Sequence, residues 1–120
     1  MITAQVKGIY STDMDRLELH PPGDPEDVCV WVRAMVGPKG GQGEESFDIG
    51  VCTPKWLANS CGREGFVVGR HYLVVSRYDP AYAQKLITEL VEKCSGDSWA
   101  EVGQKVGRIG HWEFEDYKPG

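Results

Sequence analysis

Hydrophobic and polar residues alternate along the first half of the chain, which is the pattern of strands that cover a core with one face. In the clearest run, 28–36, small and β-branched residues share one face and larger or charged residues the other: Val28, Val30, Val32, Ala34 and Val36 against Trp31, Arg33 and Met35. The segment 46–52 alternates in the same way after the glycine-rich stretch 37–43. We therefore predict a strand at 2–10 and a hairpin that joins 28–36 to 46–52.

Two helix starts are marked by a capping residue followed by proline, at Thr53-Pro54 and at Asp79-Pro80. Proline at the first helical position costs no hydrogen bond, because the N–H group there has no partner within the helix. We predict a short helix at 55–58 and a longer helix after Pro80. The longer helix is expected to cover a sheet face with its apolar side, formed by Tyr82, Leu86, Ile87, Leu90, Val91 and Cys94.

A third helix is predicted after Ser98, because Ser98-x-x-Glu101 is a capping-box pattern. Its apolar positions are Trp99, Val102, Val106 and Ile109. Gly103 and Gly107 weaken the helix, yet their four-residue spacing leaves a smooth stripe that another element can approach closely. Packing explains these two glycines better than function does.

The apolar segments 66–69 and 72–78 lack strict alternation, which predicts a strand buried on both faces inside the sheet. The 120 residues make one domain, 1–120, and 41% hydrophobic with 26% charged residues is the balance of a globular protein. Taken together, these patterns predict an α+β fold, a mainly antiparallel sheet with two or three helices packed on it.

Composition also narrows the class of partner. No stretch approaches the roughly 18 apolar residues that span a membrane, and the first residues have neither a basic leader nor an apolar signal run. We therefore expect a cytoplasmic protein without a membrane partner. Eighteen acidic against thirteen basic residues give a net charge of −5, which disfavours direct nucleic-acid binding and slightly favours a basic partner.

The cysteines and the glycine-rich stretch carry no recognisable chemistry. Cys29, Cys52, Cys61 and Cys94 lack the paired spacing of a metal site, and we expect reduced thiols, most of them buried. The stretch 37–43 lacks the spacing of a phosphate-binding loop and is followed by acidic residues, so it is expected to be a hairpin tip. No catalytic residue and no cofactor is predicted.

The end of the chain, 110–117, interleaves three aromatic residues with three acidic ones. Such a segment either fills the domain's own core or meets a partner. Trp31 and Arg33 lie on the strand face opposite the valine row, a mixture that is also found at protein interfaces. The candidate partner-binding residues are therefore Trp112, Glu113, Glu115, Asp116, Tyr117, Trp31 and Arg33.

Two alternatives to partner binding stay open. His111, Glu113 and Glu115 share one face if their segment is extended, and a histidine with two carboxylates can bind a divalent metal or run acid–base chemistry. Neither His20 nor His71 carries a local motif that ties it to this group. The other alternative is an adaptor that self-associates through an exposed sheet edge.

Several short motifs in the second half of the chain carry a resemblance to a known family. They are Phe47-Asp48-Ile49-x-Val51-x-x-Pro54-x-Trp56-Leu57, Gly69-Arg70-His71-x-Leu73-Val74-Val75, Tyr78-Asp79, Ser98-Trp99 and the closing Trp112-Glu113-Phe114-Glu115-Asp116-Tyr117. With these motifs, residues 45–117 resemble the immunity protein 8 family of bacterial polymorphic toxin systems. The closing string is the most specific part of the resemblance.

The resemblance implies a protein that binds and neutralises a cognate toxin domain. Such binding protects the producing cell from contact-dependent or secreted toxins. No catalytic residues come with the family. If the toxin is a basic nuclease, Glu113, Glu115 and Asp116 are expected to mimic substrate phosphates and to speed association.

Overall fold

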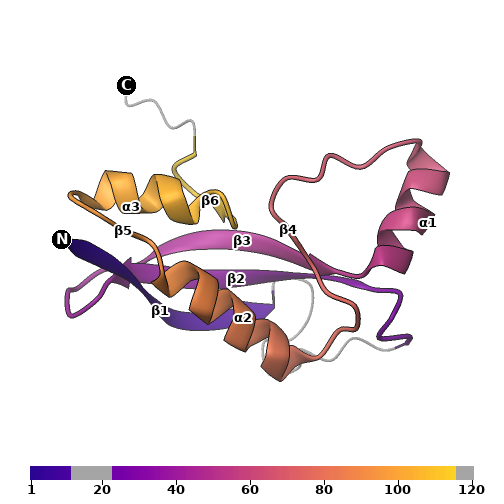
Figure 1. The fold of residues 1–120 in the computed structure, drawn as a ribbon, viewed down its shortest axis with the longest axis horizontal. Helices are drawn as coiled ribbons and strands as arrows, with labels where there is room; N and C mark the ends of the chain where they lie inside the picture. Colours follow the sequence, from indigo (N-terminus) through magenta and orange to yellow (C-terminus); the bar gives the residue numbers. More distant parts are fainter. Residues whose placement is uncertain (12–22, 116–120) are drawn as a thin grey trace.

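Three long antiparallel strands form the centre of a six-stranded sheet (Figure 1). The computed structural model describes residues 1–11 and 23–115 of the 120-residue chain. The strands are β1 (Ile2–Ser11), β2 (Cys29–Pro38), β3 (Glu45–Cys52), β4 (Tyr72–Val74), β5 (Ser95–Gly96) and β6 (His111–Trp112). The helices are α1 (Pro54–Glu64), α2 (Pro80–Glu92) and α3 (Trp99–Val106). The predicted α+β fold with a mainly antiparallel sheet is thus confirmed.

The strand order is β4-β3-β2-β1-β5, and β6 also pairs with β3. All pairs are antiparallel except β3 with β4. β6 pairs with Phe47 and Asp48, whereas β4 pairs with Gly50, Val51 and Cys52. Two short strands that are distant in sequence therefore share one edge of β3.

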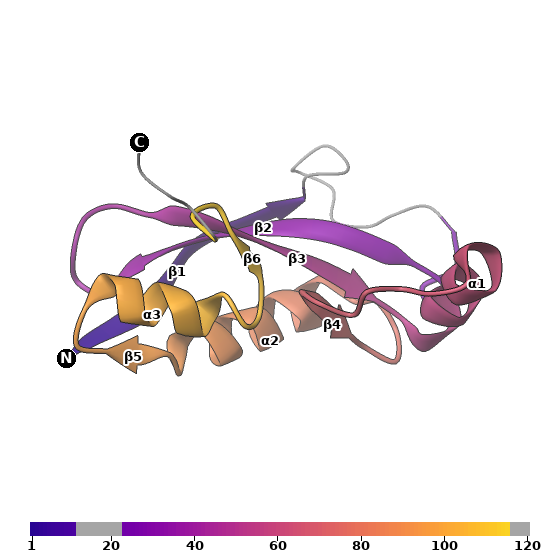
Figure 2. The ribbon, with the colours of Figure 1, turned by 90° about the horizontal axis from the view of Figure 1, so that it is seen from above.

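The helices cover only one face of the sheet, and the face without a described helix is called the open face. α2 and α3 lie against the same face, α1 lies beyond one end of the sheet, and the described chain places no helix on the opposite face (Figure 2). The valine row predicted on β2 points to the helices: Val30, Val32, Ala34 and Val36 are at most 2% exposed. From the helices, the core receives Ala83, Ile87, Val91, Val102 and Val106.

The predicted helix starts are confirmed, but the capping contacts differ in detail. The Asp79 carboxylate accepts from the Ala81 N–H at 3.1 Å, and Ser98 Oγ accepts from the Glu101 N–H at 3.2 Å. Thr53 instead accepts from the Val28 N–H at 3.1 Å, which ties the start of α1 to the start of β2. α1 is longer than the predicted segment 55–58.

The prediction of an interior strand over 66–78 is wrong. Only Tyr72–Val74 forms a strand, and it lies at the edge of the sheet. Phe66 and Val68 are 67% and 70% exposed. The interior positions are already filled by the three long strands, and β6 occupies part of the β3 edge, so only three residues of this apolar segment find a partner strand.

The predicted apolar face of α2 is only partly correct. Its buried residues are Ala83, Ile87 and Val91, whereas Tyr82 is 51% and Leu90 is 36% exposed. The buried positions follow a strict four-residue spacing, because the helix presents a narrow stripe to the sheet. The larger apolar side chains beside that stripe remain at the surface.

None of the four cysteines forms a disulfide, but the expectation that most are buried is wrong. Cys52 alone is fully buried, and burial raises its pKa to about 11. Cys29 and Cys94 are half-buried, and Cys61 is exposed on α1.

The close approach predicted at the glycine stripe of α3 occurs at Gly103. A Cβ atom there would stand 2.6 Å from Cζ2 of Trp112, closer than real carbon atoms approach. We expect Gly103→Ala to lower the free energy of unfolding by about 1–2 kcal/mol, because the strain outweighs the gain in helix propensity of about 1 kcal/mol. Urea denaturation measures this change.

Gly62→Ala is the matched control, since Gly62 lies in α1 with no atom within 4 Å of the added Cβ position. It should raise the free energy of unfolding by up to about 1 kcal/mol. Equal effects of the two substitutions would contradict the assigned packing of Trp112 on α3.

Because of Tyr78, the free energy of unfolding is expected to depend on pH in the alkaline range. It is 5% exposed, and burial, with the charge of Asp79, raises its pKa to about 12 from an ordinary 10. The folded state therefore holds the phenol proton more tightly than the unfolded state does. The stability that follows from this is fully present below pH 10 and is lost as pH rises through 12. By pH 11 the loss should reach about 1 kcal/mol.

Urea denaturation at several pH values, compared between the natural chain and Tyr78→Phe, isolates this contribution. Above pH 10, the unfolding free energy of the natural chain should fall relative to that of Tyr78→Phe. A constant difference would show that the Tyr78 phenol titrates normally.

Candidate functional site

The C-terminal arm, residues 110–115, pairs with the edge of β3 in antiparallel direction. Trp112 pairs with Phe47 and His111 with Asp48. Beyond the strand, the Glu113 N–H donates to the Ser46 carbonyl at 3.1 Å, and the Ser46 N–H donates to the Glu113 carboxylate at 2.7 Å. The arm is therefore fixed to the sheet by backbone and side-chain hydrogen bonds.

Trp112 fills the gap between the sheet and α3. Its ring stacks on Phe47 with centroids 5.9 Å apart and planes 9° apart, and it lies on Gly103 of α3. Phe114 meets the same indole edge-on at 5.9 Å and is 40% exposed. The two roles expected for this segment, filling the core and meeting a partner, therefore fall to different residues. Trp112 is half-buried and packs on the core, whereas Phe114 reaches the surface.

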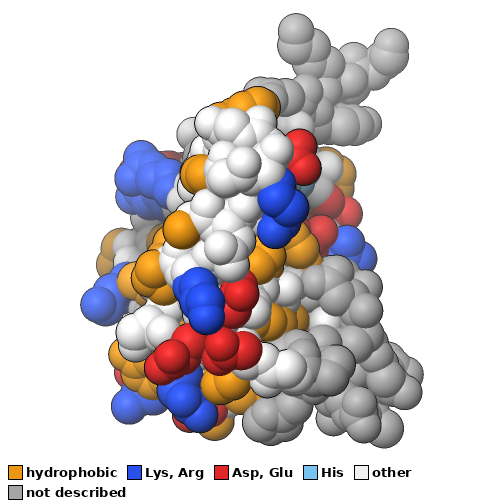
Figure 3. All heavy atoms as spheres, turned by 90° about the vertical axis from the view of Figure 1, so that its right-hand side faces the viewer, with side chains coloured by type: hydrophobic (Ala, Val, Ile, Leu, Met, Phe, Trp, Pro, Cys, Tyr) orange, Lys and Arg blue, Asp and Glu red, His pale blue; other side chains and the backbone are white. Residues whose placement is uncertain are grey.

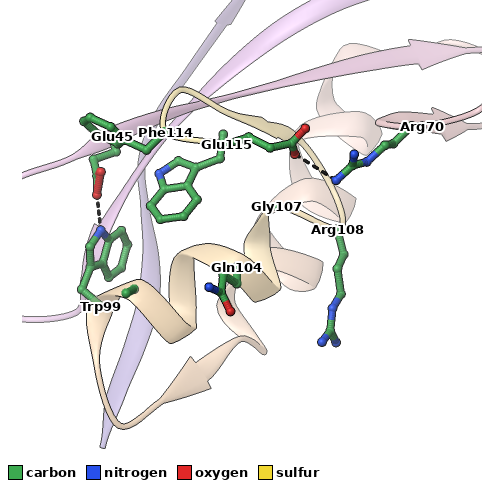
Figure 4. Close-up of a pocket in the computed structure, with 10 residues that line it drawn as sticks. Glu45, Arg70, Trp99, Gln104, Gly107, Arg108, Phe114 and Glu115 are labelled. Carbon is green, nitrogen blue, oxygen red and sulfur yellow. Dashed lines mark hydrogen bonds and ion pairs between the residues drawn. The ribbon is translucent and has the colours of Figure 1, made fainter. Parts of the chain in front are cut away.

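Glu115 lies at the centre of a charged cluster. Its carboxylate accepts from Nη2 of Arg70 at 3.1 Å (Figure 4). The same carboxylate lies 3.3 Å from Nε2 of His71. The same His71 nitrogen is 3.1 Å from the Gly107 carbonyl. Because both neighbours are acceptors, His71 donates through Nε2. Nε2 of His111 lies 3.8 Å from the other Glu115 oxygen.

His71, like Arg70, is a residue of this cluster that sequence reasoning missed. Its side chain is only 7% exposed, and its backbone adopts a φ of 68°, which is uncommon for a residue with a side chain. It meets His111 edge-on, with ring centroids 5.4 Å apart. No local motif could reveal the contact, because it depends on β4 and β6 sharing the edge of β3.

The shared face expected for His111, Glu113 and Glu115 forms only in part. β6 ends at Trp112 and a turn follows, so the Glu113 carboxylate points to Ser46. The Glu115 carboxylate lies between His71, Arg70 and His111. Across residues 1–11 and 23–115, no group of three or more His, Cys, Asp or Glu side chains could hold a metal ion.

A cavity of about 610 Å³ opens between α3 and the C-terminal arm (Figure 4). It is lined by Glu45, Arg70, Trp99, Ala100, Gln104, Gly107, Arg108, Trp112, Phe114 and Glu115. Glu45 accepts a hydrogen bond from Nε1 of Trp99, which joins β3 to α3 along one side of the cavity. Trp112 and Glu115 are the described candidate residues that line it.

Trp31 and Arg33 lie elsewhere, on the open face of the sheet. Arg33 forms two hydrogen bonds with Asp48, at 2.7 and 2.9 Å, and this carboxylate raises the Arg33 pKa. Trp31 meets Tyr72 at 5.3 Å between centroids, above Gly50. A Cβ at Gly50 would stand 2.7 Å from the Tyr72 ring, so this contact requires glycine.

The candidate residues therefore divide between two places. Trp112, Glu113 and Glu115 belong to the C-terminal arm, whereas Trp31 and Arg33 belong to the open sheet face. Asp116 and Tyr117 lie outside the described residues.

The end of the molecule that carries α1 offers a different kind of surface. Phe66 and Val68 are exposed there, after the last turn of α1. In Figure 3 apolar, basic and acidic side chains are interspersed over this end. The cavity beside the arm gathers its aromatic side chains in one hollow and is the better-formed candidate site.

In the described part of the chain, no helix has the length and apolar character needed to cross a membrane.

Comparison with known proteins identifies a family. No curated protein and no solved structure gives a significant match. A family model described as Immunity protein 8 matches residues 4–117, a range that includes β1 and β2 as well as the motifs after residue 45. The chain therefore belongs to the Immunity protein 8 family.

Proposed function

We propose that this chain binds and neutralises a cognate toxin domain and so protects the cell that produces both. The observation that carries the proposal is the family match over residues 4–117, because the family implies an immunity protein of a toxin system. The polymorphic character of that system, the cytoplasmic location and the absence of enzymatic activity are parts of the same proposal.

The build of the C-terminal arm supports this function. An inhibitor acts by occupying a surface, so it needs anchors on a rigid frame. Hydrogen bonds to Ser46 and the Glu115 cluster hold the arm, and Phe114 projects from it. We propose that the arm contacts the toxin together with the following Asp116 and Tyr117, and that Trp112, Glu113 and Glu115 hold the arm in shape.

The open sheet face is a second proposed contact. It presents Trp31 and Tyr72 beside the Arg33–Asp48 pair, a combination of aromatic and arginine side chains that is enriched at protein interfaces. A toxin contact of standard size buries about 1,200–2,000 Å² in total.

The proposed mimicry of phosphates by acidic residues needs revision. Both Glu113 and Glu115 already accept hydrogen bonds within the chain, so their carboxylates are less available to a basic nuclease than the sequence implied. If the toxin is basic, its attraction comes instead from the net charge of −5.

The two alternative functions gain little support from the site. Of the candidate metal ligands, Glu115 lies 3.8 Å from His111, but the Glu113 carboxylate is bonded to Ser46, and the described residues contain no group of three that could hold a metal ion. Self-association through β1 is opposed by Glu92, whose carboxylate accepts from the Val6 N–H at 3.0 Å, and by β5, which pairs with the start of β1. These contacts occupy edge groups that a second chain would need.

Co-expression tests the proposed function. Cells that express a candidate toxin domain encoded beside this gene should stop growing, and this chain should restore their growth. The two proteins should then co-purify as a one-to-one complex, measured by light scattering after size exclusion.

Ile87→Asp is the control for this experiment, since it buries a charge at a position with 0% exposure and should unfold the chain. It should abolish both rescue and complex. Absence of rescue and of binding with the natural chain, for every toxin domain encoded nearby, would refute the proposed function.

A further inference from the structure

We propose that the cavity between α3 and the C-terminal arm receives a protruding segment of the toxin, an apolar side chain with a carboxylate beside it. This inference rests on the proposed function and adds where the toxin binds and which chemistry is recognised there.

The walls of the cavity fit an apolar side chain. Trp99, Trp112 and Phe114 bring three aromatic rings, and Ala100 and Gly107 add small apolar surface. The volume of about 610 Å³ lies within the range of about 300–1,000 Å³ that is typical of ligand pockets. Phe114, at 40% exposure, would lose its contact with water when the cavity fills, which favours binding.

The charges at the rim select a carboxylate. Both acidic residues of the lining are engaged within the chain: Glu45 accepts from Trp99, and Glu115 accepts from Arg70 and faces His71. Arg108, in contrast, is exposed and forms no ion pair with any residue that the structure describes. Arg108 is therefore the charged side chain of the lining that forms neither a hydrogen bond nor an ion pair with any described residue.

Arg108 and Gln104 extend from the α3 side of the cavity, whereas Arg70 and Glu115 face each other across from them (Figure 4). A guanidinium can hold a carboxylate through two parallel hydrogen bonds, and the Gln104 amide offers a further donor. A lysine or arginine of the toxin would instead meet Arg108 and two carboxylates that already accept hydrogen bonds within the chain. The arrangement thus favours an acidic over a basic occupant.

Two substitutions test the cavity, with binding of the purified toxin domain measured by calorimetry. Ala100→Trp fills it from an exposed position on α3, and we expect at least a hundredfold loss of affinity. Arg108→Glu reverses the rim charge, and we expect at least a tenfold loss. Circular dichroism and thermal unfolding must show that both variants fold like the natural chain.

Matched controls place the same changes away from the cavity. Ala58→Trp adds a tryptophan to an exposed position of α1, and Arg77→Glu reverses an exposed charge before α2. Neither residue lines the cavity, and both variants should bind within twofold of the natural chain. Equal losses in the variants and their controls would overturn the proposal.

A charge swap identifies the occupant. Among toxin variants in which each aspartate or glutamate is replaced by lysine, one should bind Arg108→Glu better than it binds the natural chain.

If the natural chain binds the toxin while Ala100→Trp and Arg108→Glu bind equally well, the cavity assignment is wrong and the proposed function stands. If the natural chain binds no toxin, both fail together. A homodimer that Ala100→Trp disrupts would assign the cavity to a second copy and overturn the proposal.

Discussion

The edge of β3 is the constraint on which the rest of this structure depends. From Ser46 to Cys52, that edge is shared by Glu113, β6 and β4 in turn. Each of these partners is too short to be stable alone, because two or three residues of ladder cannot offset the entropy of ordering a chain segment. They persist because side chains join them to one another.

The join between the two short strands is made by His71 and Glu115. His71 precedes β4 and its carbonyl accepts from the Gly50 N–H at 2.9 Å, while its ring reaches Gly107 and the Glu115 carboxylate. Gly110 brings the arm close enough to β3 for this contact, since a Cβ there would stand 2.7 Å from Cγ1 of Ile49. The cavity exists because the arm is held at this position.

Local patterns predicted what depends on local chemistry. The alternation over 28–36 identified the buried face of β2, and the caps at Asp79 and Ser98 located α2 and α3. The pattern over 66–78 misled, because an apolar run does not show whether a sheet has a place left for it. The candidate site was predicted in part: the arm and Trp112 follow from composition, whereas Arg70, His71 and Arg108 come from segments that only the folded chain brings together.

The indole nitrogen of Trp112 has a consequence of its own. It is buried and has no hydrogen-bond partner among the residues that the structure describes. An unpaired buried donor costs about 1–3 kcal/mol, which stacking on Phe47 and packing on Gly103 must offset. Once the arm leaves the sheet, water can satisfy that N–H. Release of the arm would therefore move Trp112, one of the four tryptophans of the chain, from a buried stack into water.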